Sequence, residues 1–192
     1  TFTNPSQPHA FCYEFRIAYD FQRRLNEWRI ALPHNRLHSL PDGFYDVEID
    51  VEIKPGNMII AESSHKGTSK FWFTFLSHYC HVGQANDGLS GVVIMLEVLK
   101  KIRKRHPKSR FGYKTLLLPE RIGSSTYIST NEKEIDSTIG AVFSEMGGST
   151  SPLQLVFSRL SDTYIDRIFI FVLNKSINPS TEAEVELSKG SG

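Results

Sequence analysis

Three short apolar runs, each followed closely by a histidine or a glutamate, constrain the fold of this chain more than any other feature. The runs cover residues 70–77, 113–119 and 137–143 and have the length of buried strands. Between the first two, residues 89–105 carry apolar side chains three or four positions apart, which is typical of an amphipathic helix. This alternation of strands and helices predicts the α/β class, as a three-layer αβα sandwich.

The residues that follow these runs are of the types that bind metals. His78, Glu120 and Glu145 each come just after a predicted strand, and Asp87 stands where the helix begins. Because the carboxyl ends of parallel strands meet at one edge of a sheet, we expect these side chains to lie close together. Imidazole from His78 or His81 and the carboxylates are ligands for zinc, and a further carboxylate can act as general base. The sequence therefore predicts a metal site at this edge.

Each of these residues also has a simpler interpretation. Asp87 could cap the following helix, and the spacing alone favours that role. Glu120 and Glu145 could be solvated loop acids. Cys80 is most simply a small buried apolar residue, and if the chain alternates there its side chain points away from the two flanking histidines.

The rest of the chain divides by pattern. Apolar spacing over residues 11–31 predicts a helix, and alternation over residues 45–53 predicts a strand that pairs with residues 58–62 in a hairpin. A further strand is expected at 153–157 and a helix at 162–173. We expect an N-terminal helical segment, a small β hairpin region, an α/β core and a disordered tail, at residues 1–38, 39–67, 68–175 and 176–192.

Composition limits the possible partners and the compartment. The net charge of +1 gives no strong field that would attract nucleic acid or an anionic membrane. The basic residues at 100–106 suit the carboxyl end of a helix, and no apolar run reaches the length of a membrane span. Two cysteines are too few for a disulfide framework, so we expect a cytoplasmic protein. The expected partner is a peptide or small amide substrate.

Residues 78–91 read H-Y-C-H-V-G-Q-A-N-D-G-L-S-G and resemble the H-x-C-H-P-x-x-A-N-D-N-L-S-G signature of a bacterial aminopeptidase-like family. That family is related to the di-zinc aminopeptidases and glutamate carboxypeptidases. Further segments resemble it in the same order, at residues 32–43, 118–124, 145–148 and 161–167. The resemblance implies a zinc-exopeptidase type of sandwich with a small β appendage. It also implies a metal-dependent hydrolase that cleaves a peptide or related amide bond with metal-activated water.

The resemblance also implies roles for individual residues. His78 or His81 would bind one zinc ion, and Asp87 would bridge two. Glu145 would bind the other metal, and Glu120 would be the general base.

Three departures from the family pattern favour an alternative. Arg121 stands where a second glutamate ligand is expected, and Val82 replaces the proline of the signature. A late histidine ligand is expected downstream, but the last histidine is His106. The alternative is a catalytically inactive or truncated relative that acts as a binding or scaffold module.

Overall fold

The computed structural model describes residues 3–11, 30–50, 52, 54–81, 83–150, 153–176 and 185–189. The chain forms two compact units, Thr1–Asn57 and Met58–Gly192. In the first unit, helix α2 (His34–Ser39) begins directly after Pro33. Most of the helix predicted for residues 11–31 lies outside the described residues.

The predicted hairpin is not formed by the described residues of its range. Residues 44–50 have no regular secondary structure, and Tyr45, Val47 and Ile49 stay 53%, 49% and 47% exposed. An amphipathic strand needs a partner for its backbone groups and a surface for its apolar face. The described residues of this segment lie in no strand, and the small β appendage expected at residues 39–67 stays a prediction. The predicted domain boundaries themselves stay a prediction.

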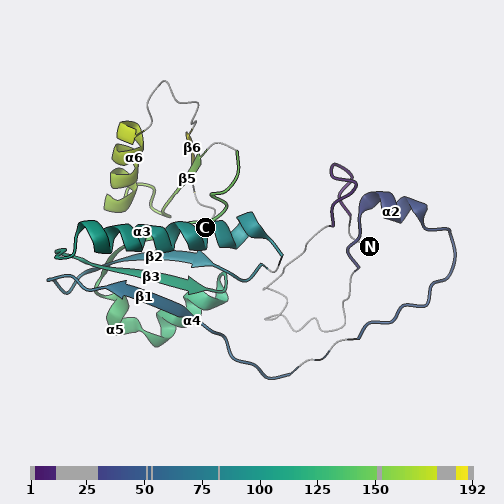
Figure 1. Ribbon diagram of the computed structural model, residues 1–192, viewed down its shortest axis with the longest axis horizontal. Helices are drawn as coiled ribbons and strands as arrows, with labels where there is room; N and C mark the ends of the chain where they lie inside the picture. The colour runs from purple at the N-terminus through teal and green to yellow at the C-terminus, as the bar shows by residue number, and fades with distance from the viewer. Residues whose placement is uncertain are drawn as a thin grey trace. The chain divides into compact units, whose positions relative to one another are not determined.

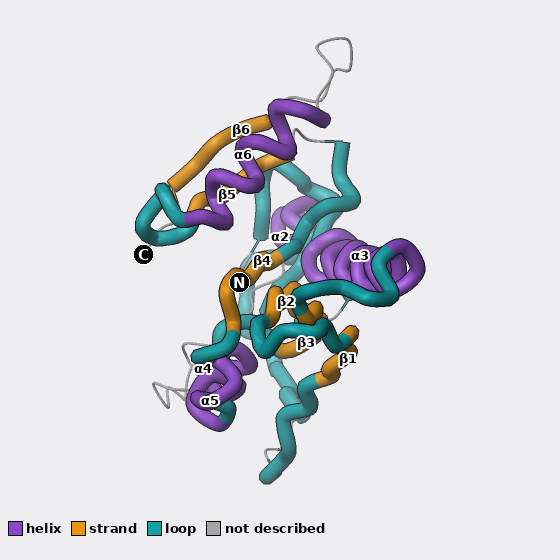
Figure 2. Tube along the Cα trace, turned by 90° about the vertical axis from the view of Figure 1, so that its left-hand side faces the viewer, coloured by secondary structure: helices purple, strands orange, loops and turns teal. Residues whose placement is uncertain are grey.

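The second unit contains, among its described residues, a four-stranded sheet in the order β1-β3-β2-β4 (Figures 1 and 2). The strands are β1 (Ala61–His65), β2 (Trp72–His78), β3 (Gly112–Leu118) and β4 (Thr138–Phe143). β2 pairs in parallel with both β3 and β4, whereas β1 runs antiparallel to β3. The three parallel strands are the three apolar runs of the sequence, which confirms that prediction. β2 lies between the other two, so its carboxyl end faces both neighbouring loops.

Helices lie on both faces of this sheet. α3 (Gly91–Arg105) covers one face, and α4 (Ile122–Thr130) and α5 (Glu132–Ile135) lie on the opposite face (Figures 1 and 2). The most deeply buried apolar side chains come from α3 and β3, namely Met95, Leu99, Leu116 and Leu118. The predicted α/β class is therefore confirmed.

A buried lysine joins the sheet to α4 and α5. Lys114 on β3 is 3% exposed, and its ammonium group forms ion pairs with Glu134 and, at 3.5 Å, with Glu62. It also donates a hydrogen bond to the hydroxyl oxygen of Tyr127 at 3.1 Å. Burial, together with the charge of Glu62 and the hydrogen bond to it, raises the pKa of Tyr127 to about 12.

The last part of the unit comprises β5 (Leu153–Phe157), α6 (Tyr164–Ser176) and β6 (Val185–Lys189). β5 and β6 pair in parallel, so the tail predicted to be disordered forms a strand in its described part. Its V-E-L-S-K sequence alternates as a strand does, and the overall polarity of the tail conceals this pattern.

α6 begins with a reciprocal cap. The backbone N–H of Thr163 donates to Asp166, and that of Asp166 donates to Thr163 Oγ1. Burial alone would raise the pKa of Asp166, but hydrogen bonds from the side chains and backbone N–H groups of Ser158 and Thr163 outweigh it. They hold the pKa well below its usual range.

Candidate metal centre

The predicted site residues lie on loops at one edge of the parallel strands. His78 is the last residue of β2, Glu120 follows β3 after one proline, and Glu145 follows β4 after one serine. Asp87 lies in η1 (Ala85–Ser90), a π-type turn between β2 and α3. The topology thus brings together residues that are far apart in the sequence.

Two hydrogen bonds hold the segment after β4 in place. The backbone N–H of Ser144 donates to the carbonyl oxygen of Leu76 at 3.0 Å, which continues the pairing of β4 with β2. The backbone N–H of Gly148 donates to Asn86 Oδ1 at 2.7 Å, which ties the same segment to η1. Because these bonds flank Glu145 on both sides, they fix its backbone between β2 and η1.

The backbone turn at Gly88 directs Asp87 toward His78. Gly88 has φ 108°, in the left-handed region that favours glycine. A Cβ atom at this position would lie 3.0 Å from the carbonyl oxygen of His78, so glycine also permits the close approach of η1. The N-cap position of α3 is occupied by Ser90. The interpretation of Asp87 as the helix cap is therefore wrong.

His78 lies between two carboxylates. Its side chain is 1% exposed, and Nε2 lies 3.0 Å from Asp87 Oδ1 and 3.2 Å from Glu145 Oε2. Nevertheless, Nε2 has no hydrogen-bond partner among the described residues. Leaving a buried polar atom unpaired costs about 1–3 kcal/mol.

A metal ion accounts for this geometry. Ligand distances of about 2.0–2.2 Å separate a nitrogen and an oxygen on the same zinc ion by about 3.0–3.5 Å. His78 would hold such an ion through Nε2, and Asp87 and Glu145 would each hold it through one carboxylate oxygen. Both observed distances fall in this range, and one ligand atom from each of His78, Asp87 and Glu145 lies within 4.8 Å of the others. The residues present therefore fit a bound metal.

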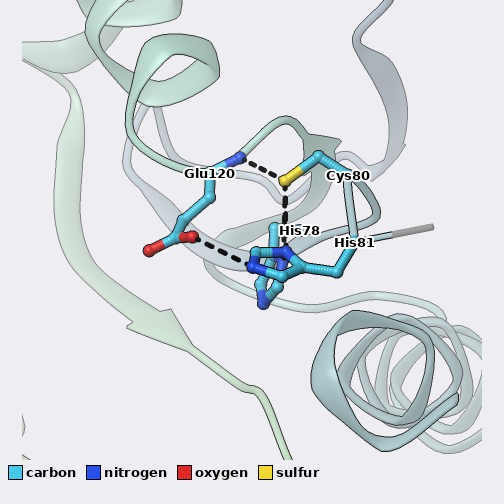
Figure 3. A group of neighbouring side chains, drawn as sticks. All are labelled: His78, Cys80, His81 and Glu120. Carbon is cyan, nitrogen blue, oxygen red and sulfur yellow. Dashed lines mark hydrogen bonds and ion pairs between the residues drawn. The ribbon is translucent and has the colours of Figure 1, made fainter. Parts of the chain in front are cut away.

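A second group of side chains, from Cys80, His81 and Glu120, lies next to the first group and shares His78 with it. His81 Nε2 lies 3.7 Å from Glu120 Oε2 and 3.9 Å from Asp87 Oδ2. Figure 3 shows Cys80 with its sulfur directed toward the imidazole rings and the backbone nitrogen of Glu120. The expectation that Cys80 points away from the site is wrong. β2 ends at His78, so the strand alternation does not extend to the next residues.

The site concentrates negative charge. In the described part of the chain, Asp87, Glu120 and Glu145 form ion pairs with histidine rings and with no lysine or arginine. Their side chains are 27%, 38% and 45% exposed, so the carboxylates are accessible from solvent. Uncompensated carboxylates beside an imidazole are attractive to a divalent cation.

Arg121 does not join this group of ligands. It occupies the N-cap position of α4 with φ 60°, and its side chain is exposed. A non-glycine residue rarely adopts this φ, so the turn after Glu120 is under backbone strain.

Known protein families and solved structures resemble this chain. Residues 14–188 match the family described as "Domain of unknown function (DUF4910)". The chain belongs to this family. The DUF4910 chain is 28% identical over 158 residues to the "Putative polysaccharide biosynthesis protein with aminopeptidase-like domain" of Clostridium acetobutylicum. That match covers 82% of this chain and 36% of the relative.

A solved structure confirms the fold of this DUF4910 chain. The crystal structure of a "putative peptidase" from Clostridium acetobutylicum matches 99% of this chain and 42% of its own, with a TM-score of 0.79 and 23% identity. The DUF4910 chain thus spans well under half the length of both relatives. Among the described residues, no helix is long and apolar enough to cross a membrane.

Proposed function

We propose that this DUF4910 chain carries the metal site of a hydrolase that cleaves a peptide or related amide bond. The observation that carries the proposal is the buried Nε2 of His78, which lies beside two carboxylates without a hydrogen bond. The aminopeptidase-like and peptidase names of its relatives support the reaction class. A zinc-exopeptidase relationship is part of the same proposal.

Zinc is the metal that we propose, with His78, Asp87 and Glu145 as its ligands. Magnesium and calcium are bound in proteins mainly by oxygen, whereas an imidazole with carboxylates is typical of catalytic zinc. A bound zinc ion would supply Lewis acidity, which activates water and polarises the substrate carbonyl. His81 is the candidate further ligand, since its Nε2 lies 3.9 Å from Asp87 Oδ2.

Glu120 is the proposed general base. Its carboxylate lies outside the group formed by His78, Asp87 and Glu145, on the far side of His81. It is partly exposed and has no lysine or arginine partner in the described residues, so it can accept a proton from the attacking water. The same oxygen would then return that proton to the leaving amine.

Metal content measured by elemental analysis tests this assignment. We expect the purified chain to hold zinc, Asp87→Ala to lose it, and Glu120→Gln to keep it while losing turnover of peptide or amide substrates. Asp162→Ala is a matched control, because this exposed aspartate pairs only with Arg167 in the described residues and should not affect zinc. An Asp87→Ala variant with unchanged zinc content would contradict the ligand assignment.

The alternative function is a binding or scaffold module without turnover. Arg121 favours it, because a guanidinium group next to Glu120 cannot be a metal ligand and opposes a cation nearby. A chain that binds no zinc, or binds it only weakly, and turns over no peptide or amide substrate would support this alternative.

A further inference from the structure

Cys80 and two histidines form a second set of metal-ligand atoms on the other side of the His78 ring. Cys80 Sγ lies 3.7 Å from His78 Nδ1 and 3.5 Å from His81 Nδ1, and the two Nδ1 atoms lie 3.1 Å apart. We propose that these three atoms bind a second divalent metal, zinc or a similarly soft ion, through a cysteine thiolate. This site shares His78, His81 and Glu120 with the proposed function but uses neither Asp87 nor Glu145, so it goes beyond that function and can be tested separately through Asp87.

The three distances have the dimensions of one face of a metal tetrahedron. Zinc–sulfur bonds of about 2.3 Å and zinc–nitrogen bonds of about 2.0–2.1 Å imply edges of about 3.6 Å between S and N and about 3.4 Å between two nitrogens. The observed edges of 3.7, 3.5 and 3.1 Å are close to these values. A hydrogen bond between the two imidazoles would explain the shortest edge alone. The two sulfur contacts are also of hydrogen-bond length for a thiol, so metal titration must distinguish the two arrangements.

A hydrogen bond holds the Cys80 sulfur in this position. The backbone N–H of Glu120 donates to Cys80 Sγ at 3.2 Å (Figure 3). The Glu120 carboxylate belongs to the same group of potential ligands, within 4.8 Å of the other three. It can orient a water at the fourth position.

Burial and ligand chemistry set the class of metal. The side chains of His78 and His81 are 1% and 11% exposed, so the site is largely shielded from bulk water. A thiolate with two imidazoles selects zinc and other soft or borderline ions over magnesium and calcium.

Both metals can bind together only if His78 coordinates through both ring nitrogens. In that state the ring would be an imidazolate, and binding would release the Cys80 thiol proton and the one N–H proton of the neutral His78 ring to solvent. No oxidant or reductant is needed, since the metal keeps its charge and only protons leave.

Cobalt(II) gives a direct readout of thiolate ligation. The full chain, freed of metal with a chelator, is titrated with Co²⁺, and the near-ultraviolet absorption from sulfur-to-cobalt charge transfer is recorded. We expect this band in the parent and in Cys12→Ser, which removes the other cysteine of the sequence. The band should be lost in Cys80→Ser. Cobalt that binds without this band, or a band that persists in Cys80→Ser, would overturn the proposal.

A thiol-reactivity measurement keeps Cys80 intact and so avoids any folding defect of Cys80→Ser. In the Cys12→Ser background, excess zinc should slow the reaction of the Cys80 thiol with a disulfide reagent by about tenfold or more, because a bound thiolate is withheld from attack. An equal rate with and without zinc would refute the site.

The Asp87→Ala variant separates the two proposals. If it retains the cobalt band but loses zinc from the other site, both proposals stand. A retained band with unchanged zinc content means that the proposed function fails while the thiolate site stands. If Asp87→Ala loses zinc but the parent chain shows no sulfur-to-cobalt band, the proposed function stands and the thiolate site fails.

Discussion

Gly91 lies where α3 meets the end of β2 and the segment that follows β4. A Cβ atom at this position would lie 2.1 Å from the carbonyl oxygen of Ser144 and 2.5 Å from Ser77 Oγ. Ordinary van der Waals contact begins near 3.4 Å, so Gly91→Ala must separate these backbones by about 1 Å or more. Ser144 directly precedes Glu145, and Asp87 lies one turn before Gly91. The substitution should therefore move two carboxylates apart.

The magnitude follows from the tolerance of a metal site. Ligand distances must hold to about 0.2 Å, so a displacement of about 1 Å exceeds that tolerance several times. Relaxation of the side chains recovers part of the loss, and we expect zinc affinity to fall about 10- to 100-fold, as it does when supporting residues are removed. That corresponds to about 1.4–2.8 kcal/mol. Overpacking should also cost about 1–3 kcal/mol of folding stability, reduced by up to about 1 kcal/mol because alanine favours helix.

Gly147→Ala is the matched control. Its Cβ would meet the Cδ1 atom of Ile94 at 2.4 Å, which is the far end of a flexible side chain that can rotate away. Gly147 lies two residues after Glu145, so this control adds a methyl group near the site without a clash against backbone atoms. Zinc affinity is measured by competition with a chelator, and folding by thermal denaturation of the metal-free chain. A folded Gly91→Ala variant that binds zinc as tightly as the parent would refute the link between this contact and the ligand geometry.

Other predictions concern the two polar networks. Lys114→Met should lower the free energy of unfolding, measured by urea denaturation, by about 1–3 kcal/mol. This loss is smaller than for a fully buried ion pair, because water still reaches both glutamates. An unchanged free energy of unfolding would contradict this prediction. Asp166→Ala should cost about 2–4 kcal/mol at pH 7. Because the folded-state pKa of Asp166 is lowered, that difference should narrow as the pH falls below about 4, and a constant difference between pH 7 and pH 3 would count against it. Because the folded-state pKa of Tyr127 is raised to about 12, its stabilising contribution should be present below about pH 10 and be lost as the pH rises toward 12. Glu62→Gln should lower the pKa of Tyr127 in an ultraviolet titration read against Tyr127→Phe, and an unchanged value would exclude the charge of Glu62 as a cause.

The parallel strands could be predicted because the apolar pattern that identifies each strand lies within its own residues. A continuous apolar run is typical of a strand buried on both faces, and β2 and β3 are largely buried in this way, whereas β4 alternates between half-buried and exposed residues. The hairpin could not be predicted in the same way. Alternation in residues 45–53 specifies an amphipathic face but not the partner that would cover it, and burial of that face depends on residues elsewhere.

At the site, the sequence predicted which residues would meet but not how they would be oriented. Strand-end topology was sufficient to place His78, Asp87 and Glu145 together. It could not decide between a helix cap and a ligand for Asp87, because both roles place an acid before the first turn of α3. In the structure Ser90 occupies the N-cap position of α3, and the role of Asp87 as a ligand stays a prediction. The direction of Cys80 depended on where β2 ends, which alternation alone does not reveal.

The carboxylates of this site need support from the rest of the fold. Asp87 and Glu145 both lie within 3.2 Å of one imidazole nitrogen, and in the described residues neither has a lysine or arginine partner. Two like charges held this close repel each other unless a cation lies between them. The backbone must therefore impose the arrangement, through the Asn86–Gly148 hydrogen bond and the close contact at Gly91. A bound metal would relieve the repulsion that these contacts oppose, and so ligand binding and folding stability should be coupled at this edge of the sheet.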